Sequence, residues 1–236
     1  MTALYRSPSL RQIETACADQ PLMERAGAAA AQWAEELAID RNLPILVLAG
    51  PGNNGGDAME CARLLRERFF DVRLVFSGLP SRLPADARGA HNRFVEGGGV
   101  CLDAIPEVSR WGLIIDGIFG IGLARAPEGR YAEWIDMANT LADEDRCPLL
   151  ALDCPSGLDG DTGRCYDQVI QATHTITFIA AKPGLYTGDG PDYCGEIRIA
   201  DLGLQADDVA AAEGRLVEPA LFDSRLVPRR HNSHKG

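Results

Sequence analysis

The chain has 236 residues, of which 46% are hydrophobic and 24% are charged. This is the composition of an ordinary globular protein with one large domain or at most two small ones, and it excludes disordered, collagen-like and coiled-coil classes. Acidic residues outnumber basic ones by 34 to 23, so the formal net charge is −11. Because Lys and Arg supply most of the non-specific affinity for nucleic acid, we expect no nucleic-acid partner.

The cysteines are scattered along the chain and form no C-x-x-C motif. This spacing fits neither a disulfide framework nor a zinc site, so it favours a reducing compartment and predicts a cytoplasmic location. The N-terminus lacks the apolar core of a signal peptide, and no apolar run approaches the roughly 20 residues of a membrane helix. We therefore expect no membrane partner.

Apolar periodicity predicts alternating helices and strands along the chain. The first forty residues read as helical, and an apolar stripe from Leu22 to Leu37 recurs at helical spacing, with Pro21 in the first turn. Strands are predicted at 45–49, 72–76, 112–116, 149–152, 174–179 and 195–199, and further helices at 58–69, 85–95 and 131–141. This alternation predicts an α/β fold, a single three-layer α/β/α domain with a mostly parallel central sheet.

Polar turns follow three of the predicted strands, at residues 50–57, 116–123 and 153–157. The carboxyl ends of parallel strands meet at one edge of a sheet, and ligands of such folds bind at that edge. We therefore expect the three turns to converge on one binding site.

The first turn contains a G-x-G-x-x-G pattern at Gly50, Gly52 and Gly55, which taken alone indicates a dinucleotide site. Two features disfavour the ordinary mode of NAD binding. No acidic residue follows the second strand, at 75–78, where one would hold a ribose. Asp57 occupies the first turn of the predicted helix, where its carboxylate would repel a phosphate.

The polar side chains of the first turn are therefore candidates for other contacts. Asn53, Asn54 and Asp57 are interpreted as groups that bind a ligand while the glycines let backbone approach it. The alternative is structural: Asp57 caps the helix, and the asparagines tolerate left-handed turn geometry.

In the second turn, Asp116 ends a strand and is followed by Gly120 and Gly122, with Arg125 nearby. Glycines at this spacing suit a concave nest of backbone amides that binds an anion, and an arginine would add a positive charge. The alternative is a tight surface loop with a solvated Arg125.

The third turn places Asp153 directly after a buried strand, a position that suits a rigid and partly desolvated acid/base. Ser156 follows, but its surroundings are not a G-x-S-x-G elbow, and the four histidines lie in the tail, on a helix or at the start of a strand. Serine nucleophile chemistry is therefore disfavoured.

Oxygen-bearing side chains from all three turns also suggest a cation site. Asn54, Asp116 and Ser156 offer an amide oxygen, a carboxylate and a hydroxyl group, which suit a weakly held hard cation better than zinc or iron. Because a single carboxylate is little charge for a divalent ion, a monovalent ion is the plausible occupant.

Together, the three turns resemble the NAD(P)H-hydrate epimerase family, which carries the YjeF-type N-terminal domain. The resemblance extends to residues 22–27, 177–178, 182–185 and 195–197, and covers nearly the whole chain. It implies a Rossmann-like fold and an enzyme that interconverts the R and S forms of hydrated NADH and NADPH. The alternatives are a non-catalytic nucleotide-binding module on the same fold and an NAD-dependent oxidoreductase.

The resemblance also implies which residues form the site. Asp153 is our first candidate for the catalytic acid/base, because its strand-end position is rigid, and Asp57 is the second. A potassium ion would be held by Asn54, Asp116 and Ser156. The residues expected to bind the substrate are Asn53, Asn54, Gly55, Gly56, Asp57, Gly120, Ile121, Gly122, Leu123, Ala124, Arg125, Ala126, Tyr131 and Asp153.

The end of the chain has a basic character, and residues 230–236 resemble the entry to an NAD(P)H-hydrate dehydratase domain. We therefore expect an epimerase domain at 1–224 and a linker at 225–236 into a C-terminal dehydratase domain, as in bifunctional members of the family. The resemblance also allows a homodimer.

Overall fold

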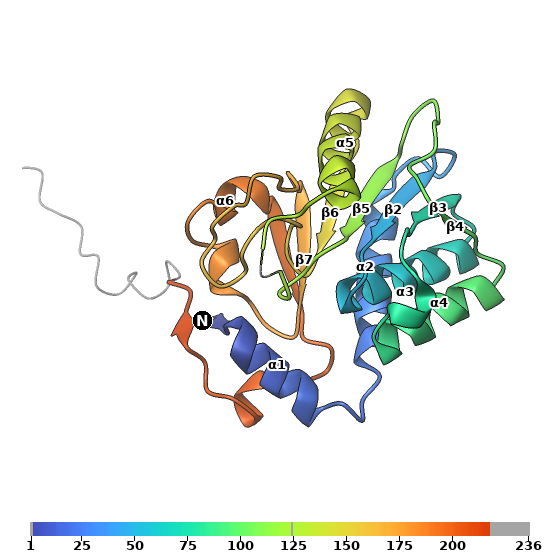
Figure 1. Cartoon of the computed structure of the whole chain (residues 1–236). Coiled ribbons are helices and arrows are strands. Elements are labelled where there is room, and N and C mark those ends of the chain that lie inside the picture. Colours follow the sequence, from blue (N-terminus) through green and yellow to red (C-terminus); the bar gives the residue numbers. More distant parts are fainter. Residues whose placement is uncertain (1, 124, 218–236) are drawn as a thin grey trace, which may run out of the picture.

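The computed structural model describes residues 2–123 and 125–217, and its centre is a parallel β-sheet (Figure 1). Within the described residues the sheet has seven strands in the order β4-β3-β2-β5-β6-β7-β8, and all neighbouring strands run parallel. In chain order they are β2 (Ile45–Ala49), β3 (Val72–Val75), β4 (Cys101–Leu102), β5 (Leu113–Gly117), β6 (Leu149–Leu152), β7 (His174–Phe178) and β8 (Glu196–Ala200). The strand order reverses between β2 and β5, as in doubly wound dinucleotide-binding folds.

Helices cover both faces of this sheet, which confirms the predicted three-layer, Rossmann-like α/β architecture. The helices of the described residues are α1 (Ser7–Ala16), which lies at the carboxyl edge of the sheet, α2 (Leu22–Leu37), α3 (Asn53–Glu67), α4 (Ala85–Glu96), α5 (Arg130–Asp145) and the short α6 (Gly190–Tyr193). On one face α3 packs between α2 and α4, and α5 packs on the opposite face against β5 and β6 (Figure 1).

Strand β2 illustrates how the sheet is buried between these layers. Every residue of the strand is buried. Ile45 and Val47 belong to the core beneath α2, α3 and α4, whereas Leu46 and Leu48 belong to the core beneath α5. Burial on both faces explains the continuous apolar run of this strand, as is usual in parallel sheets.

A small second sheet joins the two ends of the described chain. Strand β1 (Ala3–Leu4) pairs antiparallel with β9 (Gly214–Arg215), and we call this pair the terminal strap. Helix α1 follows β1 directly and is anchored by Ser7, whose backbone N–H and hydroxyl group donate to the Asp161 carboxylate over 2.7 and 2.9 Å. Figure 1 shows α1 beside the C-terminal end of the described chain.

Two helix predictions were wrong in detail. The N-terminal helical region is divided into α1 and α2, with Pro21 as the N-cap of α2 rather than part of its first turn. Helix α3 begins at Asn53 rather than near residue 58, with Gly52 as its N-cap. The predicted boundary between residues 224 and 225 and the tail at 225–236 lie outside the described residues.

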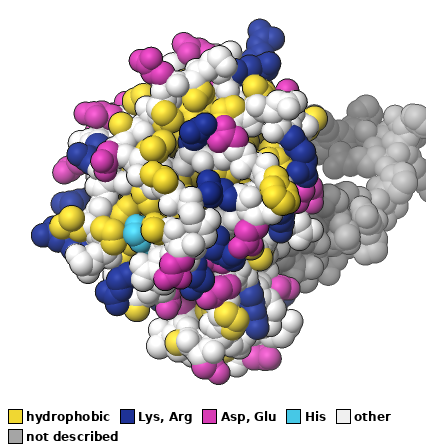
Figure 2. Space-filling model, turned by 90° about the vertical axis from the view of Figure 1, so that its right-hand side faces the viewer, with side chains coloured by type: hydrophobic (Ala, Val, Ile, Leu, Met, Phe, Trp, Pro, Cys, Tyr) yellow, Lys and Arg dark blue, Asp and Glu magenta, His cyan; other side chains and the backbone are white. Residues whose placement is uncertain are grey.

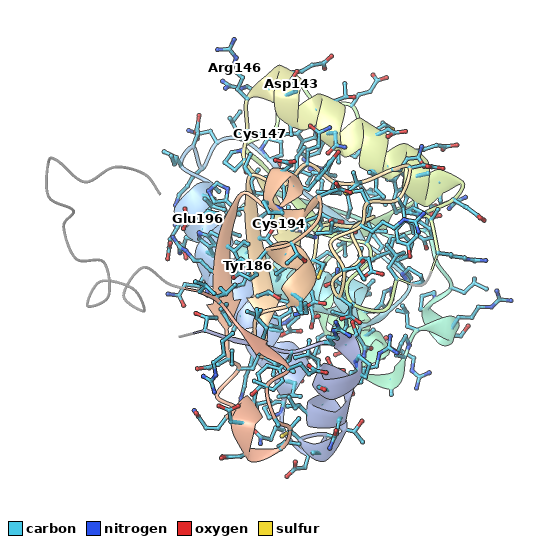
Figure 3. All side chains as sticks on the ribbon, turned by 90° about the vertical axis from the view of Figure 1, so that its left-hand side faces the viewer. Asp143, Arg146, Cys147, Tyr186, Cys194 and Glu196 are labelled. Atoms are coloured by element: carbon cyan, nitrogen blue, oxygen red, sulfur yellow. The ribbon has the colours of Figure 1, made fainter. Side chains whose placement is uncertain are left out.

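A third, smaller core lies beside β7 and β8. It is formed by Cys154, Leu158, Val169, Leu185 and Cys194. Tyr186 packs against this cluster, and Figure 3 shows Tyr186 and Cys194 close to one another. The cluster supports the segment that leads from β6 to β7.

The surface carries charges of both signs. On the face seen in Figure 2, acidic and basic side chains are interspersed with small hydrophobic areas. Among the described residues, no helix is both long and apolar enough to cross a lipid bilayer.

Candidate active site

A cavity of about 480 Å³ opens at the carboxyl edge of the sheet, between α1, α2 and the turns that follow β2, β5 and β6. A volume of this size is typical of a small-molecule site. The cavity brings together seven residues predicted from the sequence: Asn53, Asn54, Asp57, Gly120, Ile121, Gly122 and Asp153. The predicted convergence of the three turns is therefore found in the structure.

Asp153 is fixed from several directions at the end of β6. Its backbone has a φ of 68°, in the left-handed region that non-glycine residues rarely adopt, and its N–H donates to the carbonyl of Ile176 over 2.7 Å. Backbone strain of this kind is kept mainly at functional sites. The Oδ2 atom accepts a 3.0 Å hydrogen bond from the N–H of Ile121, which connects Asp153 to the turn after β5.

The other carboxylate oxygen of Asp153 contacts a lysine. Nζ of Lys182 lies 2.7 Å from Oδ1, and the Lys182 side chain is 1% exposed. Nζ also donates to Oγ1 of Thr177 over 2.6 Å and to the carbonyl of Phe178 over 3.3 Å. A buried ion pair with these additional hydrogen bonds holds the Asp153 carboxylate in one position.

Asp57 lies in a different electrostatic environment from Asp153. Burial raises its pKa well above the usual value, and repulsion from the carboxylates of Asp153, Glu14 and Asp86 raises it further. Because α3 begins at Asn53, Asp57 is not its cap, and the structural alternative considered for this residue is wrong. The two carboxyl groups therefore lie in different surroundings: Asp57 is partly buried near other carboxylates, whereas Asp153 is paired with a cation.

The glycines of the first turn serve packing. A β-carbon at Gly50 would lie 1.8 Å from the carbonyl oxygen of Ile118, and one at Gly55 would lie 2.0 Å from the carbonyl oxygen of Gly50. Gly55 and Gly56 are buried and do not line the cavity. Their small size lets the start of α3 approach the turns after β2 and β5.

The three predicted cation ligands include a connected pair. Oδ1 of Asp116 accepts a 2.6 Å hydrogen bond from the Ser156 hydroxyl group, and Oδ2 accepts one of 2.8 Å from the Ser156 backbone. Burial raises the pKa of Asp116 to about 6, against the lowering effect of these hydrogen bonds. Within the described residues, the buried amide of Asn54 has no hydrogen-bond partner at either its oxygen or its nitrogen.

The unpaired amide of Asn54 is compatible with the predicted monovalent cation. An unpaired buried amide oxygen is costly unless something binds it, and a cation would do so. No group of three or more His, Cys, Asp or Glu side chains in the described ranges is arranged to hold a metal ion. The set formed by Asn54, Asp116 and Ser156 thus offers one formal negative charge.

Other predicted substrate contacts lie away from the cavity. Leu123, Arg125 and Ala126 do not line it, and Ala124 lies outside the described residues. Tyr131 lines a second cavity, of about 550 Å³, at the ends of β2, β3 and β4, and its ring packs edge-on against Phe119 with the centroids 5.3 Å apart.

Comparison with known proteins shows the family to which the chain belongs. Residues 19–184 match the family described as YjeF-related protein N-terminus. The chain belongs to this family. The NAD(P)H-hydrate epimerase of Bordetella pertussis is 40% identical to this YjeF-related protein over 197 residues, covering 82% of the chain and 84% of the relative. That of Achromobacter xylosoxidans is 41% identical over 192 residues, covering 81% and 90%.

A longer relative and a solved structure extend the comparison. The bifunctional NAD(P)H-hydrate repair enzyme Nnr of Escherichia coli is 38% identical over 218 residues, which cover 91% of this chain but 41% of the relative. The crystal structure of yeast ynu0 superposes with a TM-score of 0.62 at 18% identity, covering 82% of this chain and 86% of that one, and supports the fold alone.

Several residues of this YjeF-related site had no role assigned from the sequence. Lys182 follows β7, and Arg11 and Glu14 reach the cavity from α1. Partial burial and the nearby Asp153 carboxylate raise the pKa of Glu14. Only two lysines occur in the chain, and Lys182 is the one that comes directly before Pro183 and Gly184 at a strand end. For Lys182, this placement was the one signal in the sequence that could have indicated a role in the site.

Proposed function

We propose that this protein is an NAD(P)H-hydrate epimerase, which interconverts the R and S forms of hydrated NADH or NADPH. The observation that carries the proposal is that Asp57 and Asp153 line one cavity in a chain that is 40% identical to a curated NAD(P)H-hydrate epimerase. Enzymes that use two carboxyl groups as acid and base place them in different environments. Burial and neighbouring carboxylates raise the pKa of Asp57, which suits the acid, whereas the ion pair with Lys182 suits Asp153 to act as the carboxylate base.

The reacting carbon of the substrate carries a hydroxyl group and is bonded to the ring nitrogen. In the mechanism that we favour, Asp57 protonates the hydroxyl group, the C–O bond breaks and water leaves, while the nitrogen lone pair stabilises the resulting cation. Water then adds to the opposite face of the ring and gives a proton to Asp153. An acid/base group positioned in this way contributes about 10²- to 10⁴-fold to a rate.

The reverse reaction uses the same two groups with their roles exchanged. Protonated Asp153 then acts as the acid and the Asp57 carboxylate as the base, and exchange with solvent restores the starting protonation states. Ring opening to an aldehyde followed by reclosure would require the same pair. The cavity also has apolar walls, formed by residues such as Leu22, Phe178 and Ile179, which suit a flat ring.

A potassium ion is part of this proposal. The unpaired amide of Asn54 supports a cation held by Asn54, Asp116 and Ser156. When bound, the ion would supply a fixed positive charge that positions a substrate oxygen. Asp116 and Ser156 themselves connect the turn after β5 to the turn after β6, because Oγ of Ser156 also accepts a 2.8 Å hydrogen bond from the N–H of Phe119.

Proton NMR of purified R-NADHX incubated with the protein tests the proposed function. We expect the S form to appear faster than in a sample without protein, and the same assay with NADPHX measures the preference between the two substrates. No change relative to the protein-free sample would instead indicate a binding module, and a redox product would indicate an oxidoreductase. A C-terminal dehydratase domain and a homodimer stay predictions from the family resemblance, and a cytoplasmic location stays a prediction from the cysteine pattern.

A further inference from the structure

We infer that Lys182 is a positioning residue for epimerisation: its ammonium group fixes Asp153 in place as the carboxylate member of the acid/base pair. The inference rests on the proposed function. Lys182 ion-pairs with Asp153, with Nζ 2.7 Å from Oδ1. Among the described residues, no hydrogen bond or ion pair joins it to Asp57, the other member of the pair.

The hydrogen bonds of Lys182 indicate that it acts through Asp153 rather than on the substrate. An ammonium group has three N–H donors. Their acceptors are Oδ1 of Asp153 at 2.7 Å, Oγ1 of Thr177 at 2.6 Å and the carbonyl oxygen of Phe178 at 3.3 Å. With all three donors occupied by protein, Lys182 has none left for a substrate oxygen.

The charges around Asp153 explain why such a residue is needed. Asp57 faces it from α3 and Glu14 from α1, and the ionised form of either group repels the Asp153 carboxylate. Arg11 on α1 interacts with Glu14, and the neighbouring Cys154 carries a buried thiol whose pKa is raised by that burial. Among the described residues, Lys182 is the cation in direct contact with Asp153. Its removal would leave the Asp153 carboxylate without a paired charge beside acidic neighbours, which disfavours the charged form.

The position of Asp153 depends on the same contact. One carboxylate oxygen binds Lys182 and the other binds the N–H of Ile121, so the ion pair also sets the orientation of the turn after β5. Lys182 is itself held at the end of β7, where its carbonyl accepts a 3.2 Å hydrogen bond from the N–H of Leu185. The lysine therefore transmits the rigidity of the sheet to Asp153.

The test is the pH dependence of epimerisation, measured as kcat and KM for the wild type and for Lys182→Met and Lys182→Arg, with the protein-free rate subtracted. At pH 7 we expect Lys182→Met to lower kcat by about 10²- to 10⁴-fold with little change in KM. We also expect the acid-side limb of its pH–rate profile to move upward by about 1 to 3 pH units, so that raising the pH restores part of the activity. Lys182→Arg keeps the positive charge, so the acid-side limb of its pH–rate profile should stay at the wild-type position. Its kcat should be reduced.

Two threonine variants on β7 provide a matched comparison. Thr177→Val removes an acceptor of Lys182, whereas Thr175→Val removes an equally buried hydroxyl group that donates to the carbonyl of Cys194 instead. Both leave the lysine charge in place, so neither should move the acid-side limb. A shift in Thr175→Val would trace the effect to general loosening of β7 and overturn the inference.

The outcomes separate this inference from the proposed function. A wild-type protein that does not epimerise the substrate refutes the proposed function and, with it, the inference. An active wild type combined with a Lys182→Met variant that loses activity equally at every pH, or that loses none, refutes the inference alone. If Lys182→Met does not fold, Lys182→Arg decides: an unchanged limb with a lower kcat and an unchanged KM supports the positioning role, and any other result contradicts it.

Discussion

Gly120 faces the carboxylate of Asp153 so closely that a β-carbon at Gly120 would lie 2.6 Å from Oδ2. This approach lets the next residue, Ile121, donate its N–H to the same oxygen over 3.0 Å. The glycine therefore acts on the geometry of Asp153 and adds no polar group of its own. Its replacement should disturb catalysis without changing any charge.

Gly120→Ala should lower the rate of epimerisation by about 10²-fold, because a misplaced catalytic group loses rate steeply with distance. Gly122→Ala is the matched comparison in the same turn, since a β-carbon there meets no atom within 4 Å. It should lose far less activity than Gly120→Ala. Steady-state kinetics of the two variants checks this, and equal losses would contradict it.

Asp153→Asn should lower epimerisation by about 10²- to 10⁴-fold, because the base is removed. It should also destabilise the protein by about 3 to 5 kcal/mol, since buried Lys182 would lose the partner of its charge. Urea unfolding measures the stability and NMR measures the turnover. Asp136→Asn, an exposed site on α5, is the control for loss of one carboxylate. Turnover near the wild-type level in Asp153→Asn would transfer the catalytic role to another residue.

Asp57→Asn should lose epimerase activity, and it should also change how the stability of the protein depends on pH. The folded-state pKa of Asp57 is raised, so its contribution to stability is fully present below the unfolded-state pKa, about 4, and is lost as the pH rises through the folded-state pKa. Asparagine does not ionise, so the variant should lose less stability between pH 4 and pH 8 than the wild type. Urea unfolding across this range tests the sign, and Asp136→Asn should behave like the wild type.

Potassium should stabilise the protein relative to tetramethylammonium at equal ionic strength, by about 2.7 kcal/mol when its concentration is one hundred times Kd. Asn54→Leu should abolish this difference. In tetramethylammonium alone the variant should be as stable as the wild type or more so, since it removes two buried polar atoms without partners. Thermal melts in both salts measure this, with Asn92→Leu, exposed on α4, as control. A potassium effect that persists in Asn54→Leu would place the ion elsewhere.

The sheet was predictable because its strands have simple patterns. The runs that form β2 and β6 are short, wholly apolar and bounded by polar turns, so the sequence identifies their extent. Strand β4 consists of Cys101 and Leu102 alone and has no periodicity to detect. The start of α3 was misplaced because its first residues include Gly55 and Gly56, which are weak helix formers held in place by packing.

The site was predictable where its residues follow strands, and not where the tertiary fold supplies them. Asp57 and Asp153 come from polar turns whose convergence follows from parallel topology. Lys182 precedes a Pro-Gly turn, and such lysines are normally solvated. Glu14 lies on a helix that is held at the cavity by contacts with distant segments, such as the terminal strap and Asp161. No local pattern encodes a contact between segments so distant in the chain.

The terminal strap also affects when the cavity can be completed during protein synthesis. Strand β1 is made before its partner strand, Gly214–Arg215, which follows about two hundred residues later. A nascent chain still attached to the ribosome can assemble β2 to β7, yet α1 has no anchor from β9 until that strand has emerged. Ser7 can already bind Asp161 at that stage, so the terminal strap is a late additional contact, and chains that lack β9 should hold the wall that carries Glu14 less firmly.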